Sequence, residues 1–291
     1  MKKLLIVFIS FSSLAACVTK HEEKKEVLDD PVLIEAEVSI KELFYAVPSP
    51  MELSTLFKKA GLQFEKSYLL SHEEMSHYHE SEKMALILGV YGADLSYSSI
   101  FKRTQEAMVY MSVCKDLSEN LGIGTGFNEK MVMRLESNIE NKDSIISIIA
   151  ASFLDMDNYL KENKQSENAT LVVIGGWIEG IYLGTSMIQT SESNQEIKEV
   201  IRDQYGSLKS LIKLANSQTY TSQTQIAMLL AKLESVFKTI QPTSASSGTM
   251  QQEGELLVLK QTKIQEQEID DTAFEEINEQ IKIIRNTIIQ H

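Results

Sequence analysis

Cysteine is scarce in this chain, since only two of its 291 residues, Cys17 and Cys114, are cysteines. Small secreted domains that cannot build a sufficient core are usually held together by several disulfide bonds. Two cysteines exclude such a disulfide framework. Cys114 falls in a helical pattern, where we expect it to act as a small buried apolar side chain.

Proline and glycine are also infrequent, with four prolines and thirteen glycines. Both residues interrupt helices, so their scarcity favours helices over a sheet sandwich, as do the twelve methionines and the many Leu, Ile, Glu, Lys and Gln residues. We therefore predict an all-α fold, either a multi-helix bundle or an irregular helical array. Any β structure should be minor and confined to the N-terminal arm and the region before the last helix.

Basic residues are outnumbered, with 28 Lys and Arg against 41 Asp and Glu, and the formal net charge is −13. A strongly acidic protein is not attracted to nucleic acid or to anionic lipid headgroups. The composition therefore excludes nucleic acid as a partner and a basic patch as the means of membrane attachment.

Motifs that carry known chemistry are absent as well. The sequence contains no Gly-x-Ser-x-Gly elbow, no Walker loop and no Cys-x-x-Cys pair. His72 and His77 are five residues apart, which places them about 140° apart around a helix and not on the shared face that zinc ligation requires. The glycines of 122–126 follow a helix and not a strand, so the context of a dinucleotide site is missing. We predict no catalytic residue, no cofactor and no metal site, and a protein that is not an enzyme.

The N-terminal residues form a recognisable export signal. Lys2 and Lys3 precede a short apolar run over 4–11, and the sequence Leu-Ala-Ala-Cys ends at Cys17. These features are typical of a secretory signal, and Leu-Ala-Ala-Cys resembles the lipobox of bacterial lipoproteins. The resemblance implies a signal peptide over residues 1–16 and attachment of fatty acid (palmitate) chains to Cys17. An ordinary signal peptide with a chance cysteine is the alternative.

A lipid on Cys17 would attach the protein to the membrane by its N-terminus. We expect an outer-membrane lipoprotein that faces the periplasm and not the cell surface, with an envelope protein as a second partner. The apolar run is far shorter than the roughly 20 residues that a transmembrane helix needs. Residues 17–31 are charged and almost free of large apolar groups, so we predict a flexible tether.

Composition and capping signals divide the remaining chain. We predict a helical domain over residues 32–240, a linker over 241–271 and a C-terminal helix over 272–291. Ser49, Pro50 and Glu52 form a capping box that should start a helix, and Gly61 should end it. The sequence 71–74, Ser-His-Glu-Glu, repeats the capping-box pattern and is expected to start the next helix.

The predicted C-terminal helix carries a regular apolar seam. Its apolar residues alternate in steps of three and four, at Phe274, Ile277, Ile281, Ile284 and Ile288. This spacing is typical of a helix that packs along another helix. We expect it to pack back on the helical domain, and contact with a helix of a partner protein is the alternative.

Two apolar stretches, Leu86–Tyr97 and Leu171–Ile188, are predicted to be the central helices. Each combines glycines, aromatic residues and a single acid, Asp94 or Glu179. A glycine inside a helix costs about 1 kcal/mol relative to alanine, and close approach of a neighbouring helix is the usual compensation. The stripe of Gly176, Gly180 and Gly184 should therefore face another helix.

The same two helices supply the candidate binding residues. If they left a groove, an apolar ligand would contact side chains from both helices, namely Tyr91, Asp94, Tyr97, Trp177, Glu179 and Tyr182. A packed core is the competing interpretation. Asp94 and Glu179 would alternatively serve as an acid–base pair of an envelope enzyme. In the other interpretation, each is hydrogen-bonded to a tyrosine or paired with a cation such as Arg103 or Arg202.

Two segments carry a family resemblance. The sequence Phe-Tyr-Ala-Val-Pro-Ser-Pro at 44–50 and the sequence Leu-Gly-Val-Tyr-Gly-Ala-Asp-Leu-Ser-Tyr at 88–97 resemble a family of uncharacterised lipoproteins of the Bacteroidota type. The resemblance extends over about 40–240 and over the last helix. It supports the interpretation as a lipoprotein and implies no particular activity. The sequence thus favours a non-catalytic, lipid-anchored scaffold or binding module, with a carrier of small apolar ligands and an envelope enzyme as alternatives.

Overall fold

The computed structural model describes most of the chain after residue 41. The described residues are 42–123, 129–138, 141, 143–145, 147–149, 151–152, 155, 166–188, 194–217, 221–241, 249–253, 256–260 and 271–290. The predicted signal peptide over 1–16, the lipidated Cys17 and the tether over 17–31 lie outside these residues.

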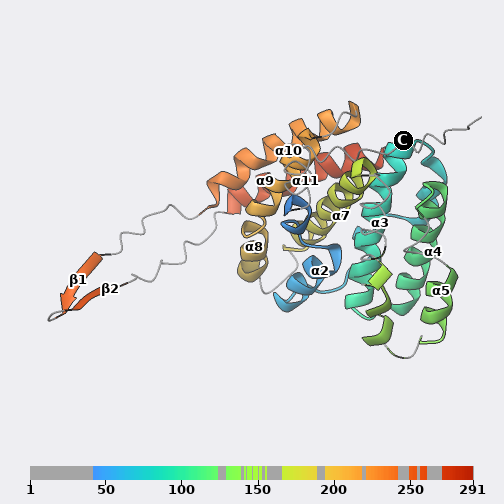
Figure 1. Ribbon diagram of the computed structural model, residues 1–291, viewed down its shortest axis with the longest axis horizontal. Helices are drawn as coiled ribbons and strands as arrows, with labels where there is room; N and C mark the ends of the chain where they lie inside the picture. The colour runs from blue at the N-terminus through green and yellow to red at the C-terminus, as the bar shows by residue number, and fades with distance from the viewer. Residues whose placement is uncertain are drawn as a thin grey trace, which may run out of the picture.

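Helices dominate the described part of the chain (Figure 1). In chain order, the helices, short 3₁₀ helices and strands are α2 (Pro50–Lys59), η1 (Lys66–Tyr68), η2 (His72–His77), α3 (Ser81–Ile100), α4 (Thr104–Asn120), α5 (Glu129–Glu136), α7 (Ser166–Ser186), α8 (Asn194–Arg202), α9 (Tyr205–Asn216), α10 (Thr221–Thr239), β1 (Thr249–Glu253), β2 (Leu256–Lys260) and α11 (Asp271–Ile289). The prediction of an all-α helical array is confirmed.

The described β structure is one hairpin that precedes the last helix. Strands β1 and β2 pair antiparallel, with Thr249 opposite Lys260 and Glu253 opposite Leu256. The hairpin falls within the predicted linker and lies apart from the helices in Figure 1. Minor β structure was also predicted for the N-terminal arm, but residues 42–45 form a helical turn.

Helices α3 and α7 lie side by side at the centre of the helical array (Figure 1). Every residue of α3 from Ala85 to Ile100 is buried, and most apolar residues of α7 from Leu171 to Leu183 are below 3% exposed. A helix that is apolar on all sides belongs in the interior, and helices α2, α4 and α11 pack around this pair. The burial of both helices follows from their composition.

Helix α7 is the one described helix that is long and apolar enough to cross a membrane, over Glu167–Ser186. Within this structure, 83% of its most apolar window is buried by other parts of the protein. That burial is the property of a core helix, since a membrane-spanning helix directs apolar residues to lipid.

Local capping signals predicted the boundaries of α2. The Ser49 hydroxyl accepts the backbone N–H of Glu52 at 3.3 Å, and the Glu52 carboxylate accepts the N–H of Ser49 at 2.7 Å. Gly61 follows the helix with a φ of 91°, and Leu62 N–H donates to the Phe57 carbonyl at 2.9 Å. Both predictions for this helix, the capping box and the glycine at its end, are confirmed.

The predicted start of the central helix at 71–74 is wrong. Residues His72–His77 form a 3₁₀ segment, Tyr78 is extended, and α3 begins at Ser81. The Tyr78 side chain is 4% exposed, and its hydroxyl donates to the Ile289 carbonyl of α11 at 2.9 Å. Burial of this tyrosine outweighs the local capping signal, because helical continuation would move its ring away from α11.

The seam of α11 is buried against the helical domain. The five seam residues are 0–4% exposed, and α11 packs on α7, α10 and α3. The last carbonyl groups of the helix also find partners, because the Lys83 ammonium donates to Ile288 at 2.8 Å and to Thr287 at 3.2 Å. Cations at a helix C-terminus are stabilising.

Candidate functional site

The backbones of α3 and α7 touch directly at their glycines. A Cβ atom on Gly89 would lie 2.1 Å from the Val172 carbonyl oxygen, and one on Gly175 would lie 2.0 Å from that of Leu86. Gly176 meets Gly89, with 3.3 Å between the would-be Cβ atom and the Gly89 oxygen. Close backbone approach therefore accounts for these glycines.

The remaining glycines of the predicted stripe contact α2 and not α3. Cβ atoms on Gly180 and Gly184 would lie 2.8 Å from Leu53 Cδ1 and 2.4 Å from Phe57 Cζ. Leu53 and Phe57 are 0% and 2% exposed. The glycine stripe thus contacts both α3 and α2, and protein atoms fill the space that the predicted ligand groove would occupy.

The six candidate groove residues do not line one surface. Tyr91, Tyr97, Trp177, Asp94 and Glu179 are 0–1% exposed, while Tyr182 is partly buried beside the core. The structure brings two of them, the acids, together in the interior.

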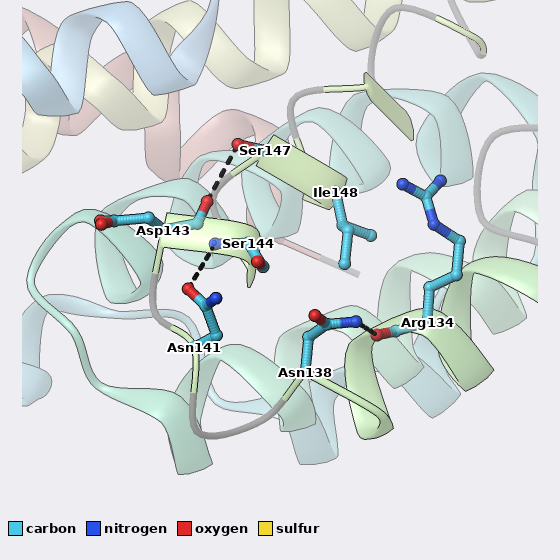
Figure 2. A pocket seen from close by; sticks show the side chains of 7 residues that line it. All are labelled: Arg134, Asn138, Asn141, Asp143, Ser144, Ser147 and Ile148. Carbon is cyan, nitrogen blue, oxygen red and sulfur yellow. Dashed lines mark hydrogen bonds between the residues drawn. The ribbon is translucent and has the colours of Figure 1, made fainter.

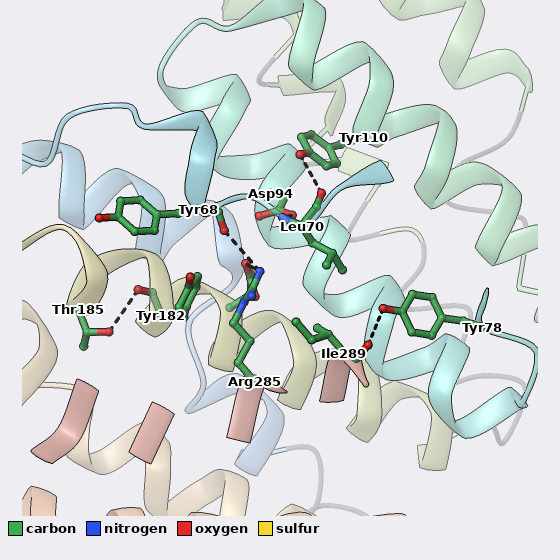
Figure 3. A network of polar contacts seen from close by, with 10 residues as sticks. Tyr68, Leu70, Tyr78, Asp94, Tyr110, Tyr182, Thr185, Arg285 and Ile289 are labelled. Atoms are coloured by element: carbon green, nitrogen blue, oxygen red, sulfur yellow. Dashed lines mark hydrogen bonds and ion pairs between the residues drawn. The ribbon is translucent and has the colours of Figure 1, made fainter. Parts of the chain in front are cut away.

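Glu179 is paired with Arg285 of the last helix. Figure 3 shows Arg285 with its hydrogen bond to the Tyr68 carbonyl. Arg285 Nε donates to Oε2 at 2.6 Å and Nη2 donates to Oε1 at 3.0 Å, which is a bidentate pair. The same Nη2 donates to the Tyr68 carbonyl at 3.4 Å, and the guanidinium lies 4.1 Å from the ring centre of Tyr182. A charged Glu179 is therefore compensated inside the core.

Asp94 lies next to this pair with only one oxygen bonded to the backbone. Its Oδ2 accepts the N–H of Leu70 at 3.1 Å. Its Oδ1 is buried and has no hydrogen-bond partner among the described residues, and the Glu179 charge acts on the same carboxyl. A negative charge on Asp94 would therefore be buried without a cation of its own, which is costly. We therefore assign a proton to Asp94.

The electrostatics of the cluster agree with this assignment. Burial raises the pKa of the Asp94 carboxyl well above its usual value, and the Glu179 charge adds to the shift. Burial also raises the pKa of Glu179, but Arg285 opposes that shift through its charge and its hydrogen bonds. Arg285 stays protonated at any relevant pH. With a proton on Asp94, the acid pair and Arg285 together carry no net charge.

Tyrosines around the acid pair fix the backbone of the segment 61–80 on α3 and α4. Tyr91, Tyr97 and Tyr110 donate their hydroxyl hydrogens to the carbonyls of Ser71, Gln63 and Leu70 at 2.7–3.0 Å. Burial is the main cause that raises the pKa of each of these tyrosines, so each stays a donor. Polar groups in the core thereby satisfy backbone carbonyls of a segment that has short 3₁₀ helices and no α-helix.

Arg285 was not predicted to belong to this site. The sequence suggested Arg103 or Arg202 as the cation for the two acids, whereas Arg202 lies 3.7 Å from Asp203 and Arg103 stacks on Phe64. One signal was available: Arg285 directly follows the apolar seam residue Ile284. A basic residue beside an apolar seam, in a chain with two acids in apolar runs, indicates a buried ion pair.

Replacing Asp94 by asparagine tests the assigned proton. The pKa of Asp94 is raised in the folded protein. Between about pH 4 and this raised pKa, the folded protein therefore keeps the proton that the unfolded chain loses. The stability of the wild type falls as pH rises through this range. Asparagine offers the same donor and acceptor without ionising. We expect Asp94→Asn to gain stability over wild type, by at most about 1.4 kcal/mol per pH unit in this window.

Urea unfolding followed by fluorescence of the single tryptophan, buried Trp177, measures this difference from pH 4 to pH 8. Asp203→Asn is the matched control, since the Asp203 side chain is 71% exposed. Asp94→Ala should be destabilised at every pH because it leaves Leu70 N–H unpaired. A loss of stability in Asp94→Asn equal to that in Asp94→Ala would mean that Asp94 is ionised.

Surface hollows lie elsewhere on the protein. One of these hollows has a volume of about 430 Å³. Figure 2 shows its lining, which consists of polar residues and one isoleucine: Arg134, Asn138, Asn141, Asp143, Ser144, Ser147 and Ile148. Another, of about 170 Å³, lies where the end of α7 meets α8 and α11, and it includes the Lys198–Asp271 ion pair. Neither hollow is lined by Asp94 or Glu179.

Comparison with known proteins identified no relative of this chain. No protein-family model, curated protein or solved structure matches this chain.

Proposed function

We propose that this protein is a non-catalytic, lipid-anchored component of the bacterial outer membrane, with its helical domain acting as a scaffold or binding module on the periplasmic side. The observation that carries the proposal is the N-terminal sequence, in which two lysines and an apolar run lead to Leu-Ala-Ala-Cys at Cys17. The net negative charge leaves a covalent lipid as the means of attachment.

The geometry of the core supports a role without catalysis. A general acid or base must come within hydrogen-bond reach of its substrate. Asp94 and Glu179 are both 0% exposed, and Arg285 occupies both oxygens of Glu179. An enzyme that used these acids would have to open its core, so the pair is better explained as the link between α3, α7 and α11.

The packing of the central helices likewise disfavours a carrier of small apolar ligands. Such a carrier needs a concave apolar site, and the interface of α3 and α7 is occupied by the two backbones and by side chains of α2. The scaffold or binding role is the function that we retain.

Lipid attachment is tested by metabolic labelling with an alkyne fatty acid. We expect label on the wild-type protein and a complete loss of label in Cys17→Ala. Cys114→Ala is a matched control, because Cys114 is the other cysteine of the chain, is 0% exposed and should not change labelling. Label that persists in Cys17→Ala, or a wild type without label, would contradict the proposed anchor.

The binding role is tested by cross-linking intact envelopes and isolating the full-length protein. A scaffold should yield defined cross-linked complexes that depend on the anchor and weaken in Cys17→Ala. Recovery of the protein only as an uncross-linked monomer, with label on Cys17 intact, would argue against the scaffold and leave the anchor standing.

A further inference from the structure

We propose that the groove between α4 and α5 binds a basic amphipathic helix of a partner protein. This inference deepens the proposed binding role and names its surface and the chemistry of its partner. The groove, of about 570 Å³, is open to solvent between the two helices. Met108, Met111 and Val132 supply its apolar lining, and we call it the methionine groove.

The lining has the adaptable character of a helix-binding surface. Met111 is buried in the core at 2% exposed, while Met108 is only partly buried beside it. Val132 on the α5 side is likewise partly buried. Methionine side chains are flexible and polarisable, and they are frequent where apolar faces of varied helices bind.

The rim of the methionine groove is acidic. Glu119 lies along α4, while Glu129 and Glu136 lie along α5. Among the described residues that line the groove, Lys115 is the one basic residue. Lys115 already donates to Glu119 at 2.9 Å. The hydrogen bond to Glu119 and the charges of Glu119, Asp116 and Glu129 together raise the pKa of Lys115. The rim therefore carries three carboxylates against one ammonium, while the basic residues of α5, Lys130 and Arg134, lie outside the groove lining.

The spacing of these charges matches a helical ligand. Glu129 and Glu136 are seven residues apart on one helix, so they lie on the same side about 10 Å from each other. A ligand helix with an apolar stripe and lysines or arginines beside it would place the stripe on the methionines and its cations on the two glutamates. Electrostatic complementarity of this kind speeds association and selects basic partners. A second copy of this chain is a poorer occupant, because its net charge is −13.

The test uses the full-length protein in nonionic detergent and an 18-residue peptide of leucine and lysine with helical apolar periodicity and one photo-reactive leucine. We expect cross-links on α4 and α5. Glu129→Lys with Glu136→Lys should lower the cross-linking yield at least about tenfold. Both residues are exposed, so this variant should keep the wild-type unfolding transition. Partition of the peptide into detergent is the same for every variant, so differences report on the protein.

A double variant on other helices controls for net charge. Glu196→Lys with Glu276→Lys changes the charge equally at exposed positions of α8 and α11, and its yield should stay near wild type. Equal loss in both double variants, or equal yield from a scrambled peptide, would overturn the proposed site. Sedimentation that shows self-association broken by the α5 variant would identify a second copy as the occupant and also overturn it. Lipid labelling on Cys17 is independent of each of these results.

Discussion

Arg285→Met is expected to lower the free energy of unfolding by about 3 to 5 kcal/mol at neutral pH. The substitution keeps most of the apolar stem but leaves Glu179, at 0% exposed, without its counterion. It also removes the hydrogen bond to the Tyr68 carbonyl and the stacking on Tyr182. Because α11 is tied to α7 by this pair, the helix should separate from the domain more readily.

The loss should depend on pH with a defined sign. Without Arg285 the pKa of Glu179 rises further, since Arg285 is what opposes its upward shift. The folded variant then gains stability from protonation, so its deficit relative to wild type shrinks as pH falls toward the ordinary glutamate range. Urea unfolding at pH 5 and pH 8, followed by tryptophan fluorescence, measures both values.

Lys282→Met is the matched control on the same helix. The Lys282 side chain is 40% exposed and contacts Glu279 on the surface at 2.9 Å, a pair worth at most about 1 kcal/mol. A further variant, Arg285→Met with Glu179→Met, removes both charges and should recover part of the loss. Equal effects of Arg285→Met and Lys282→Met would show that the buried pair is not important for folding.

Gly89→Ala and Gly175→Ala are each expected to destabilise the protein by about 3 kcal/mol or more, or to prevent folding. Each new methyl group would lie about 2 Å from a backbone carbonyl oxygen of the facing helix. A backbone cannot rotate away as a side chain does, so α3 and α7 would have to move apart. That movement would open the most buried interface of the protein and separate Asp94 from Glu179.

Gly206→Ala is the control for glycine replacement itself. Outside the adjoining backbone of α9, no atom of the described residues lies within 4 Å of a Cβ at Gly206. This variant should therefore be unchanged or slightly stabilised by its higher helix propensity. Thermal unfolding followed by circular dichroism compares the three variants. Wild-type stability in Gly89→Ala and Gly175→Ala would contradict the close contact of the two helices.

Some residues of the site could be predicted from the sequence and others could not. Asp94 and Glu179 could be singled out because an acid within an apolar helix is conspicuous, and both proved to be fully buried. Their cation was harder to identify, because Arg285 is 106 residues beyond Glu179 and its place beside the apolar seam of α11 was the one local signal for it. Gly175 was missed because the four-residue spacing pointed to Gly176, although Gly175 makes the closer contact.

The sequence by itself determined the helical class, the caps of α2 and the central place of two helices. These features depend on hydrogen bonds between residues three or four apart and on the apolar content of single segments, which are properties of the local chain. Only the tertiary structure decided that α2 covers Gly180 and Gly184, that Tyr78 ends the 3₁₀ segment, and that Arg285 neutralises the acid pair. Each of these depends on groups distant in sequence, whose pairing is favourable only after the helices have excluded water from the core.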